Sequence, residues 1–234
     1  MSPALPFVLI PTLLYDRYMS DRIAVVTGAN AGLGKETAIG LARAGLTVVM
    51  ACRSRERGEA ARADILARLP GADLEVMALD LASLASVRAF AAAFREAHPR
   101  LDLLINNAGI MMPPPARSED GFEIQMAANH FGHFLLTALL IGQMPDSPQS
   151  RVVSLASVAH KRGRIRPDTL ATAGDYRQSK LACLMFAFEL DRRLARAGRN
   201  ILSVAAHPGV SLTPLVRHMN PLLIALLRYT IAPV

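Results

Sequence analysis

The chain has 234 residues, a length that suits one α/β domain with a sizeable core. Hydrophobic residues make up 52% of the composition but aromatic residues only 5%, so aliphatic side chains and alanine are expected to fill that core. The formal net charge of +7 comes from arginines scattered over predicted helix faces without an aromatic platform, a pattern that indicates solvated helix surface and excludes nucleic acid as an expected partner. Cys52 and Cys183 match no metal-ligand or disulfide spacing, which predicts a reduced, cytoplasmic protein with no metal site.

Residues 1–21 form an apolar segment that we expect to be an N-terminal arm. Three prolines interrupt it, and its apolar run is shorter than the about 20 residues of a membrane span. It also lacks the basic start and the small-residue cleavage site of a signal peptide. An arm that is loose or packed on the surface is therefore favoured over membrane association, which stays the alternative.

The next segment, residues 23–38, is predicted to be a buried parallel strand followed by a glycine-rich turn and a helix. Gly28, Gly32 and Gly34 crowd into that turn. Backbone N–H groups at such a turn point outward at the positive end of a helix dipole and commonly bind phosphate. The spacing is G-x-x-x-G-x-G rather than the G-x-G-x-x-G of the common dinucleotide motif. A turn that serves tight packing alone is the alternative.

Apolar runs and helical patterns alternate through the rest of the chain. The expected helices cover residues 36–44, 57–69, 84–97, 122–143 and 176–197, and the expected strands cover residues 46–51, 74–79, 101–105, 151–155 and 201–206. Residues 111–115 and 161–174 are expected to be loops. The alternation predicts right-handed βαβ crossovers and a Rossmann-type doubly wound parallel sheet in a three-layer α/β/α fold, with the ligand beyond the carboxyl ends of the strands.

Motifs at these strand ends and on a neighbouring helix resemble those of the short-chain dehydrogenase/reductase family. They are TGANAGLG at residues 27–34, NNAG at 106–109, Ser157, Tyr176-x-x-x-Lys180 and Pro208-Gly209. Within the family the chain is most similar to the retinol-dehydrogenase-like branch, through ACR at 51–53, INNAGIMM at 105–112 and NHFGHF at 129–134. The resemblance covers about residues 22–218 and implies an NADP-binding catalytic domain there.

The resemblance also implies that the chain stops before the C-terminal helix and strand that relatives usually carry. On this interpretation residues 219–234 are an apolar C-terminal segment and a candidate truncated lid, with a partner-binding surface or a membrane contact as the alternatives. A shared helical interface in the family implies a homo-oligomer.

Tyr176 and Lys180 are four residues apart, so they share one face of the predicted helix. An ammonium beside a phenol favours the phenolate, and we therefore expect Lys180 to lower the pKa of Tyr176 from its usual value near 10. The resemblance implies that Tyr176 exchanges a proton with the substrate oxygen and that Lys180 also holds the nicotinamide ribose. A surface Tyr and Lys on an ordinary helix are the alternative.

Ser157 follows a predicted strand, where its hydroxyl is placed to stabilise charge on a substrate oxygen. A strand-end cap is the alternative. Ser154 is expected inside the strand. The family usually has a Ser-Ser pair where this chain has Ala156-Ser157, and the resemblance assigns the catalytic role to Ser157.

Asn129 stands mid-helix, where asparagine has weak propensity. The resemblance implies that Asn129 kinks the helix and helps to hold a water in a proton relay to Lys180. A solvent-facing asparagine is the alternative. His130 and His133 are expected to be packed and hydrogen-bonded rather than metal ligands.

The choice of cofactor depends on the end of the second strand. NAD enzymes of this kind place an acid there, whereas this chain has Cys52 followed by Arg53. A guanidinium pairs well with a 2′-phosphate, so NADP(H) is favoured over NAD(H). With the glycine turn and Arg53, the resemblance implies a set of cofactor contacts at the strand ends: Gly28, Asn30, Gly32, Leu33, Gly34, Asp80, Leu81, Asn107, Ala108, Gly109, Tyr176, Lys180, Pro208, Gly209 and Thr213.

Two functions from different classes follow from these observations. The favoured one is an oxidoreductase that transfers a hydride between NADP(H) and the alcohol or carbonyl group of a small apolar substrate. Met111, Met112 and residues 113–115 are expected to lie near the substrate. The alternative is a dinucleotide-binding regulatory or interaction module with little or no turnover.

Overall fold

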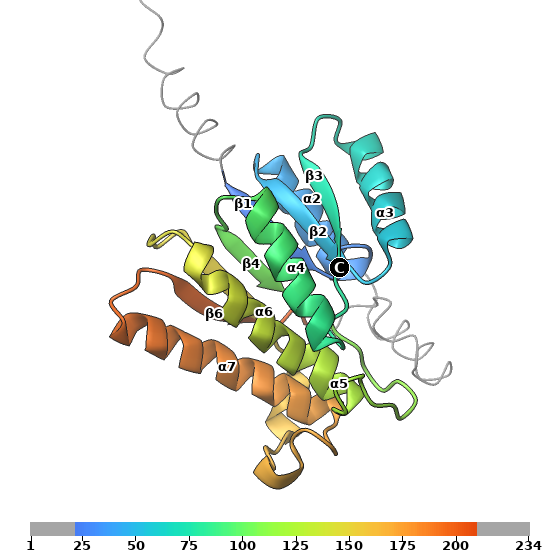
Figure 1. The fold of residues 1–234 in the computed structure, drawn as a ribbon, viewed down its shortest axis with the longest axis vertical. Coiled ribbons are helices and arrows are strands. Elements are labelled where there is room, and N and C mark those ends of the chain that lie inside the picture. The colour runs from blue at the N-terminus through green and yellow to red at the C-terminus, as the bar shows by residue number, and fades with distance from the viewer. Residues whose placement is uncertain (1–21, 210–234) are drawn as a thin grey trace, which may run out of the picture.

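The sheet has six parallel strands in the order β3-β2-β1-β4-β5-β6 (Figure 1). This computed structural model describes residues 22–209. The strands are β1 (Ile23–Thr27), β2 (Thr47–Cys52), β3 (Leu74–Ala78), β4 (Leu103–Asn106), β5 (Arg151–Leu155) and β6 (Leu202–Ala206). The order reverses between β1 and β4, as in a doubly wound sheet, so the predicted fold class is confirmed.

Helices cover both faces of the sheet and complete the three layers. They are α2 (Gly32–Arg43), α3 (Arg55–Arg68), α4 (Leu84–Ala97), α5 (Ile124–Met126), α6 (Gly132–Leu140) and α7 (Tyr176–Arg196). Figure 1 shows α4, α6 and α7 side by side over one face. Alternate strand residues point to opposite faces: Val25 and Val49 pack with α4 and α6, whereas Ala24 and Val48 pack with α2 and α3.

Most predicted elements differ from the observed ones by one or two residues at their ends. Ser83 caps α4 as expected for the helix at 84–97, its hydroxyl accepting from the Ser86 N–H at 3.3 Å. The helix predicted at 36–44 begins earlier, at Gly32, because the glycine turn itself forms its first turn. The loop predicted at 161–174 contains short 3₁₀ turns, Val158–Arg162 and Pro167–Thr169.

The helix predicted over residues 122–143 is observed over Ile124–Gln143, but not as one regular α-helix. The stretch consists of α5, a π-turn at Ala127–Phe131, α6 and a 3₁₀ turn at Ile141–Gln143. A π-turn widens the helix by one residue and changes the partners of its carbonyl groups. Asn129 lies within that turn.

The helical stretch Ile124–Gln143 has 20 residues and a mean hydropathy of 1.3, enough by length and composition to cross a membrane. Core helices of globular domains meet the same criteria. Here α6 packs on α4, and Asn129, His133 and Thr137 are buried and hydrogen-bonded within the fold. These contacts identify it as a core helix of the domain.

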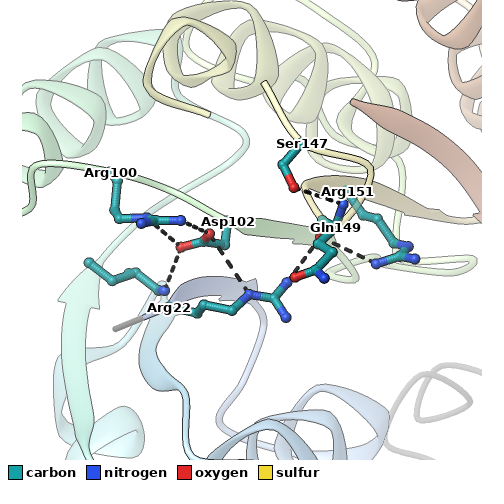
Figure 2. A network of polar contacts seen from close by, with 7 residues as sticks. Arg22, Arg100, Asp102, Ser147, Gln149 and Arg151 are labelled. Atoms are coloured by element: carbon teal, nitrogen blue, oxygen red, sulfur yellow. Dashed lines mark hydrogen bonds and ion pairs between the residues drawn. The ribbon is translucent and has the colours of Figure 1, made fainter. Parts of the chain in front are cut away.

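At the amino ends of β1, β4 and β5, a polar network surrounds the buried carboxylate of Asp102 (Figure 2). Arg100 donates to both of its oxygens, and the Ile23 N–H donates to it at 2.9 Å. Arg22 lies 3.8 Å from the same carboxylate and donates to the Gln149 carbonyl oxygen at 3.0 Å. The network fixes three neighbouring strands at the end of the sheet opposite to the predicted site.

Candidate active site

The glycine turn after β1 has the geometry of an anion site. Gly28 has a φ of +67°, a conformation that favours glycine. A Cβ on Gly34 would collide with the Gly28 carbonyl and the Asn107 amide. No side chain caps α2, and its first turn carries no acidic residue, so the N–H groups at its positive end have no anionic protein partner in the described residues.

Thr27 joins this turn to the one after β4. Its hydroxyl oxygen accepts from the backbone N–H groups of Asn107 and Ala108, both at 2.9 Å. The Asn107 side chain in turn donates to the Thr27 carbonyl at 2.7 Å. One buried hydroxyl therefore holds two of the predicted cofactor turns together.

His133 connects Thr27 to the π-turn. Its Nδ1 lies 2.9 Å from the Asn129 carbonyl oxygen, which can only accept, so Nδ1 carries the proton. Nε2 then accepts from the Thr27 hydroxyl at 2.9 Å. Burial lowers the pKa of His133 to about 4, which keeps the ring neutral. Burial also lowers the pKa of His130 to about 4, and that ring packs edge-on against Phe186. The expectation of packed, hydrogen-bonded histidines is met at His133.

Asn129 is buried and bridges two elements with its side chain. Oδ1 accepts from the Ile110 N–H at 2.8 Å, and Nδ2 donates to the Ile110 carbonyl at 3.0 Å and to Ser179 Oγ at 2.9 Å. Its own carbonyl accepts from His133 and from the Cys183 thiol at 3.1 Å. Asn129 thus ties the loop after β4 to α7 from behind the cavity wall, and it is not a solvent-facing residue.

Tyr176, Lys180 and Ser157 meet at the carboxyl end of β5. Tyr176 is the first residue of α7, which the Asp175 side chain caps by accepting from the Gln178 N–H at 2.8 Å. Lys180 Nζ donates to the Leu155 carbonyl at 2.8 Å and lies 5.8 Å from the centre of the Tyr176 ring. Ser157 Oγ accepts from the Ala159 N–H at 3.3 Å as the cap of the turn that follows β5, and its hydroxyl lies close enough to the Tyr176 phenol to lower the pKa of that phenol.

The expected lowering of the Tyr176 pKa by Lys180 is wrong in this structure. Burial raises the pKa of Tyr176, and the nearby Ser157 hydroxyl only partly offsets the rise. Burial also lowers the pKa of Lys180, whose ammonium is directed to the Leu155 carbonyl. Tyr176 is therefore protonated at neutral pH and can donate a proton.

One cavity of about 1010 Å³ lies over the carboxyl ends of all six strands. The predicted residues that line it are Gly28, Asn30, Gly32, Leu33, Gly34, Arg53, Asp80, Leu81, Asn107, Ala108, Gly109, Ser157, Tyr176, Lys180, Pro208 and Gly209. Asn129 does not line it, and Thr213 lies outside the described residues. Segments 1–21 and 219–234 also lie outside them.

Some residues that line the cavity were not among the predicted ones. Ser54 and Arg57 line the cavity together with Arg53. The Ser54 hydroxyl caps α3 by accepting from the Arg57 N–H at 3.2 Å, which brings Arg57 into the first turn of that helix. A serine directly after a strand is a typical helix cap, and this pattern could have predicted that Arg57 lies in the first turn of α3, near the strand ends. Gln125 also lines the cavity, and no local pattern distinguishes it from a polar residue on an ordinary helix.

Cys52 is the last residue of β2 and is buried. Burial raises the pKa of its thiol to about 11, although N–H groups of Ala29 and Asn30 favour the thiolate. The thiol is therefore neutral at pH 7. A neutral group there removes the repulsion that a carboxylate would exert on a phosphate.

A parallel sheet with a phosphate-type glycine turn and a Tyr–Lys–Ser group beside one cavity defines a nucleotide-binding α/β protein. The family model for short chain dehydrogenases matches residues 22–222, and the chain belongs to that family. Within it, the chain resembles the retinol dehydrogenases. It is 47% identical to human retinol dehydrogenase 13 over 84% of this chain and 61% of that protein, and 44% identical to bovine retinol dehydrogenase 12 over 87% and 66%. The chain thus spans less than two thirds of the length of these relatives.

Solved structures give the same fold. A protein from Mycobacterium paratuberculosis superposes with a TM-score of 0.73 at 46% identity, covering 86% of this chain and 72% of that one. RhlG from Pseudomonas aeruginosa, an active-site complex with NADP, gives 0.69 at 28% identity over 86% and 78%. A short chain dehydrogenase from Burkholderia phymatum, in complex with NAD, gives 0.66 at 25% identity over 87% and 71%.

Proposed function

We propose that this protein is an oxidoreductase that transfers a hydride between NADP(H) and the alcohol or carbonyl group of a small apolar substrate. The observation that carries the proposal is the meeting of Tyr176, Ser157 and Lys180 at the cavity that the glycine turn also lines. The family match over residues 22–222 supports one nucleotide-binding catalytic domain over residues 22–218. The names of the relatives support the alcohol–carbonyl reaction.

The residues present fit a nicotinamide dinucleotide. Gly34 leaves no side chain between the glycine turn and Asn107, and the first turn of α2 presents N–H groups without an acid. These groups would hold the pyrophosphate. When bound, NADP(H) supplies or accepts the hydride.

The proton is the part of the reaction that this chain supplies. The raised pKa keeps Tyr176 in its acid form, so it can protonate the oxygen of a carbonyl substrate as charge develops there. Ser157 lines the cavity with Tyr176 and would bind that oxygen too. Lys180 Nζ is held by the Leu155 carbonyl, 5.8 Å from the centre of the Tyr176 ring, and would hold the nicotinamide ribose. Asn129 acts from behind the wall by fixing Ile110.

The preference for NADP(H) over NAD(H) rests on the end of β2. Arg53 and Arg57 line one part of the cavity, next to the neutral thiol of Cys52 and the positive end of α3. A 2′-phosphate is a dianion and is stabilised by guanidinium groups and a helix N-terminus. Glu56 lines the same part and opposes this charge, but the two arginines outnumber it.

The partners follow from the surface and the cavity lining. Ile110, Met111 and Met112 line the cavity and favour an apolar substrate. Phe134 on α6 and Phe188 on α7 are 52% and 65% exposed, which supports burial of this face in a homo-oligomer. No nucleic-acid partner is proposed, and cytoplasmic localisation stays a prediction.

The test is the consumption of NADPH with a panel of aldehydes and ketones, for the wild type and Tyr176→Phe. The wild type should turn over at least one apolar carbonyl, and the variant should lose about 10²–10⁴ in kcat because it lacks the proton donor. Equal kcat in both proteins would refute the role of Tyr176. Tight NADPH binding without turnover of any carbonyl would favour a dinucleotide-binding regulatory or interaction module instead.

A further inference from the structure

Two loops supply the walls of the cavity away from the glycine turn. The Met112 loop, residues 107–123, connects β4 to α5, and the Val158 loop, residues 156–175, connects β5 to α7. Met111 and Met112 line the cavity from the first loop, and Val158 and Ala159 line it from the second. The apolar lining of this end therefore comes from segments with little regular structure, so something else must hold them.

Met112 has an unusual backbone conformation for its residue type. Its φ is +49°, the only positive φ of a non-glycine residue in the part of the chain that the structure describes. The left-handed region is unfavourable for a residue with a Cβ, and such residues persist where their surroundings fix them. The Met112 side chain is 60% exposed and lines the cavity, so its own packing does not fix it.

A buried glutamine holds the backbone of Met112. Oε1 of Gln125, on α5, accepts from the Met112 N–H at 3.0 Å. Nε2 of the same side chain donates to Oε1 of Glu123 at 3.2 Å. With both ends of its amide engaged, Gln125 cannot rotate without losing one of these bonds.

Glu123 extends this set of bonds to the second loop. Its Oε2 accepts from the N–H groups of Gln125 and Met126, as the cap of α5. Its own N–H donates to the carbonyl oxygen of Ala171 in the Val158 loop at 2.7 Å. A continuous series of hydrogen bonds thus runs from Met112 through Gln125 and Glu123 to Ala171.

Close packing reinforces the attachment of the second loop to α5. A Cβ on Gly174 would collide with the Met126 side chain and lie 3.4 Å from Glu123 Oε2. Gly174 is two residues before Tyr176. The first turn of α5 therefore fixes Met112 on one wall and the approach to Tyr176 on the other.

We infer that Glu123 and Gln125 are positioning residues that set the separation of the two walls, and that Met112 is the residue that selects substrates by the length of their apolar part. The inference rests on the proposed function, because it assigns the substrate end of the same cavity. The selected class is carbonyl compounds with an unbranched apolar chain that reaches the thioether of Met112.

The first test measures kcat/KM for a homologous series of straight-chain aldehydes with NADPH. Each methylene that becomes buried should raise the wild-type kcat/KM roughly fourfold until the chain passes Met112. Met112→Gly keeps a backbone that tolerates positive φ but removes the side chain, so the increment should disappear for the methylenes that contact it. Gln125→Leu should raise KM more for long aldehydes than for the shortest one, because the lost hydrogen bond releases the wall at Met112.

A double variant separates positioning from general damage. Glycine at 112 needs no help to adopt a positive φ, so Gln125→Leu should cost less in the Met112→Gly background than alone. Glu119→Gln, an exposed acid in the same loop, is the matched control and should leave the series unchanged. Additive effects, or an unchanged dependence on chain length in Met112→Gly and Gln125→Leu, would overturn the inference.

The second test needs no turnover and so distinguishes this inference from the proposed function. Hydrogen–deuterium exchange should be about fivefold faster in both loops of Gln125→Leu and Glu123→Ala, because the lost bonds anchor both. Faster exchange in one loop alone, or in neither, would contradict the coupling even if the enzyme is active. If the wild type reduces no carbonyl while both loops exchange faster in the two variants, the proposed function is refuted and the positioning of the walls is supported.

Discussion

The two ends of the sheet use charge in opposite ways. At the amino ends of the strands, the buried Asp102 takes its hydrogen bonds from Arg100 and the Ile23 N–H, so its charge is satisfied within the protein (Figure 2). At the carboxyl ends, the first turn of α2 has no capping side chain and Arg53 faces the cavity. Polar groups at the amino ends of the strands therefore stabilise the fold, whereas those at the carboxyl ends leave hydrogen-bond donors available for a ligand.

The largest effect of a single substitution on stability is expected from Asp102→Ala. The change leaves the buried Ile23 N–H and the Arg100 guanidinium without their acceptor and should lower the free energy of unfolding by about 3 kcal/mol. Urea denaturation measures this, with Asp168→Ala, an exposed acid, as the control. The NADPH affinity of the folded protein should not change, and a selective loss of affinity would break the contrast between the two ends.

Acid should destabilise the fold through the buried His133 and the partly buried His130. The pKa of His130 and of His133 falls from the usual 6.5 to about 4 in the folded protein, so between these values the unfolded state binds more protons. Stability is therefore complete above pH 6.5 and decreases as the pH falls toward 4, by about 1.4 kcal/mol per pH unit for each histidine.

His133→Asn sharpens this test, since asparagine can still donate to the Asn129 carbonyl but does not titrate. The slope of the free energy of unfolding against pH, between pH 6.5 and 4, should decrease by the contribution of one histidine, about 1.4 kcal/mol per pH unit. An unchanged slope would show that His133 is not the titrating group.

Thr27→Val should lower the free energy of unfolding by less than Asp102→Ala does. It removes the acceptor of the Asn107 and Ala108 N–H groups. Unpaired buried groups cost about 1–3 kcal/mol. Because Thr27 joins two turns at the carboxyl end, this change should weaken NADPH binding as well as stability, unlike Asp102→Ala. Calorimetric titration of NADPH, with thermal unfolding in parallel, detects both; weaker stability with full affinity would contradict this account.

The smallest effect concerns cofactor choice. Arg53→Ala should weaken NADPH binding about tenfold and leave NADH binding within twofold, since only NADPH carries the 2′-phosphate. Arg55→Ala is the matched control, because Arg55 is an exposed arginine paired with Glu59 and does not line the cavity. Equal losses for both cofactors in Arg53→Ala would argue against the NADP(H) preference.

The sheet and much of the cavity lining could be predicted from the sequence, because both follow from local patterns. Buried parallel strands are continuous apolar runs, and their carboxyl ends carry the polar motifs. The resemblance implied a kink at Asn129, but its form, a π-turn in which His133 and Cys183 both donate to the Asn129 carbonyl, has no local sequence signature.

The direction of the Tyr176 pKa shift was also beyond the sequence. A spacing of four residues predicts proximity to Lys180, but the ammonium is directed to the Leu155 carbonyl and burial has the larger effect on Tyr176. The hydrogen bond from the Met112 N–H to Gln125 could not be predicted for a similar reason. A glutamine in an amphipathic segment has no local signature of a buried hydrogen-bond partner 13 residues away.

The most direct measurement of the central claim follows the hydride itself. The wild type is incubated with an apolar aldehyde and NADPH deuterated at the reactive C4 position of the nicotinamide, and the alcohol product is analysed by mass spectrometry. The account predicts one deuterium on the carbinol carbon of the product and none with Tyr176→Phe over the same time. Tight binding of NADPH with no deuterated alcohol from the wild type would contradict it.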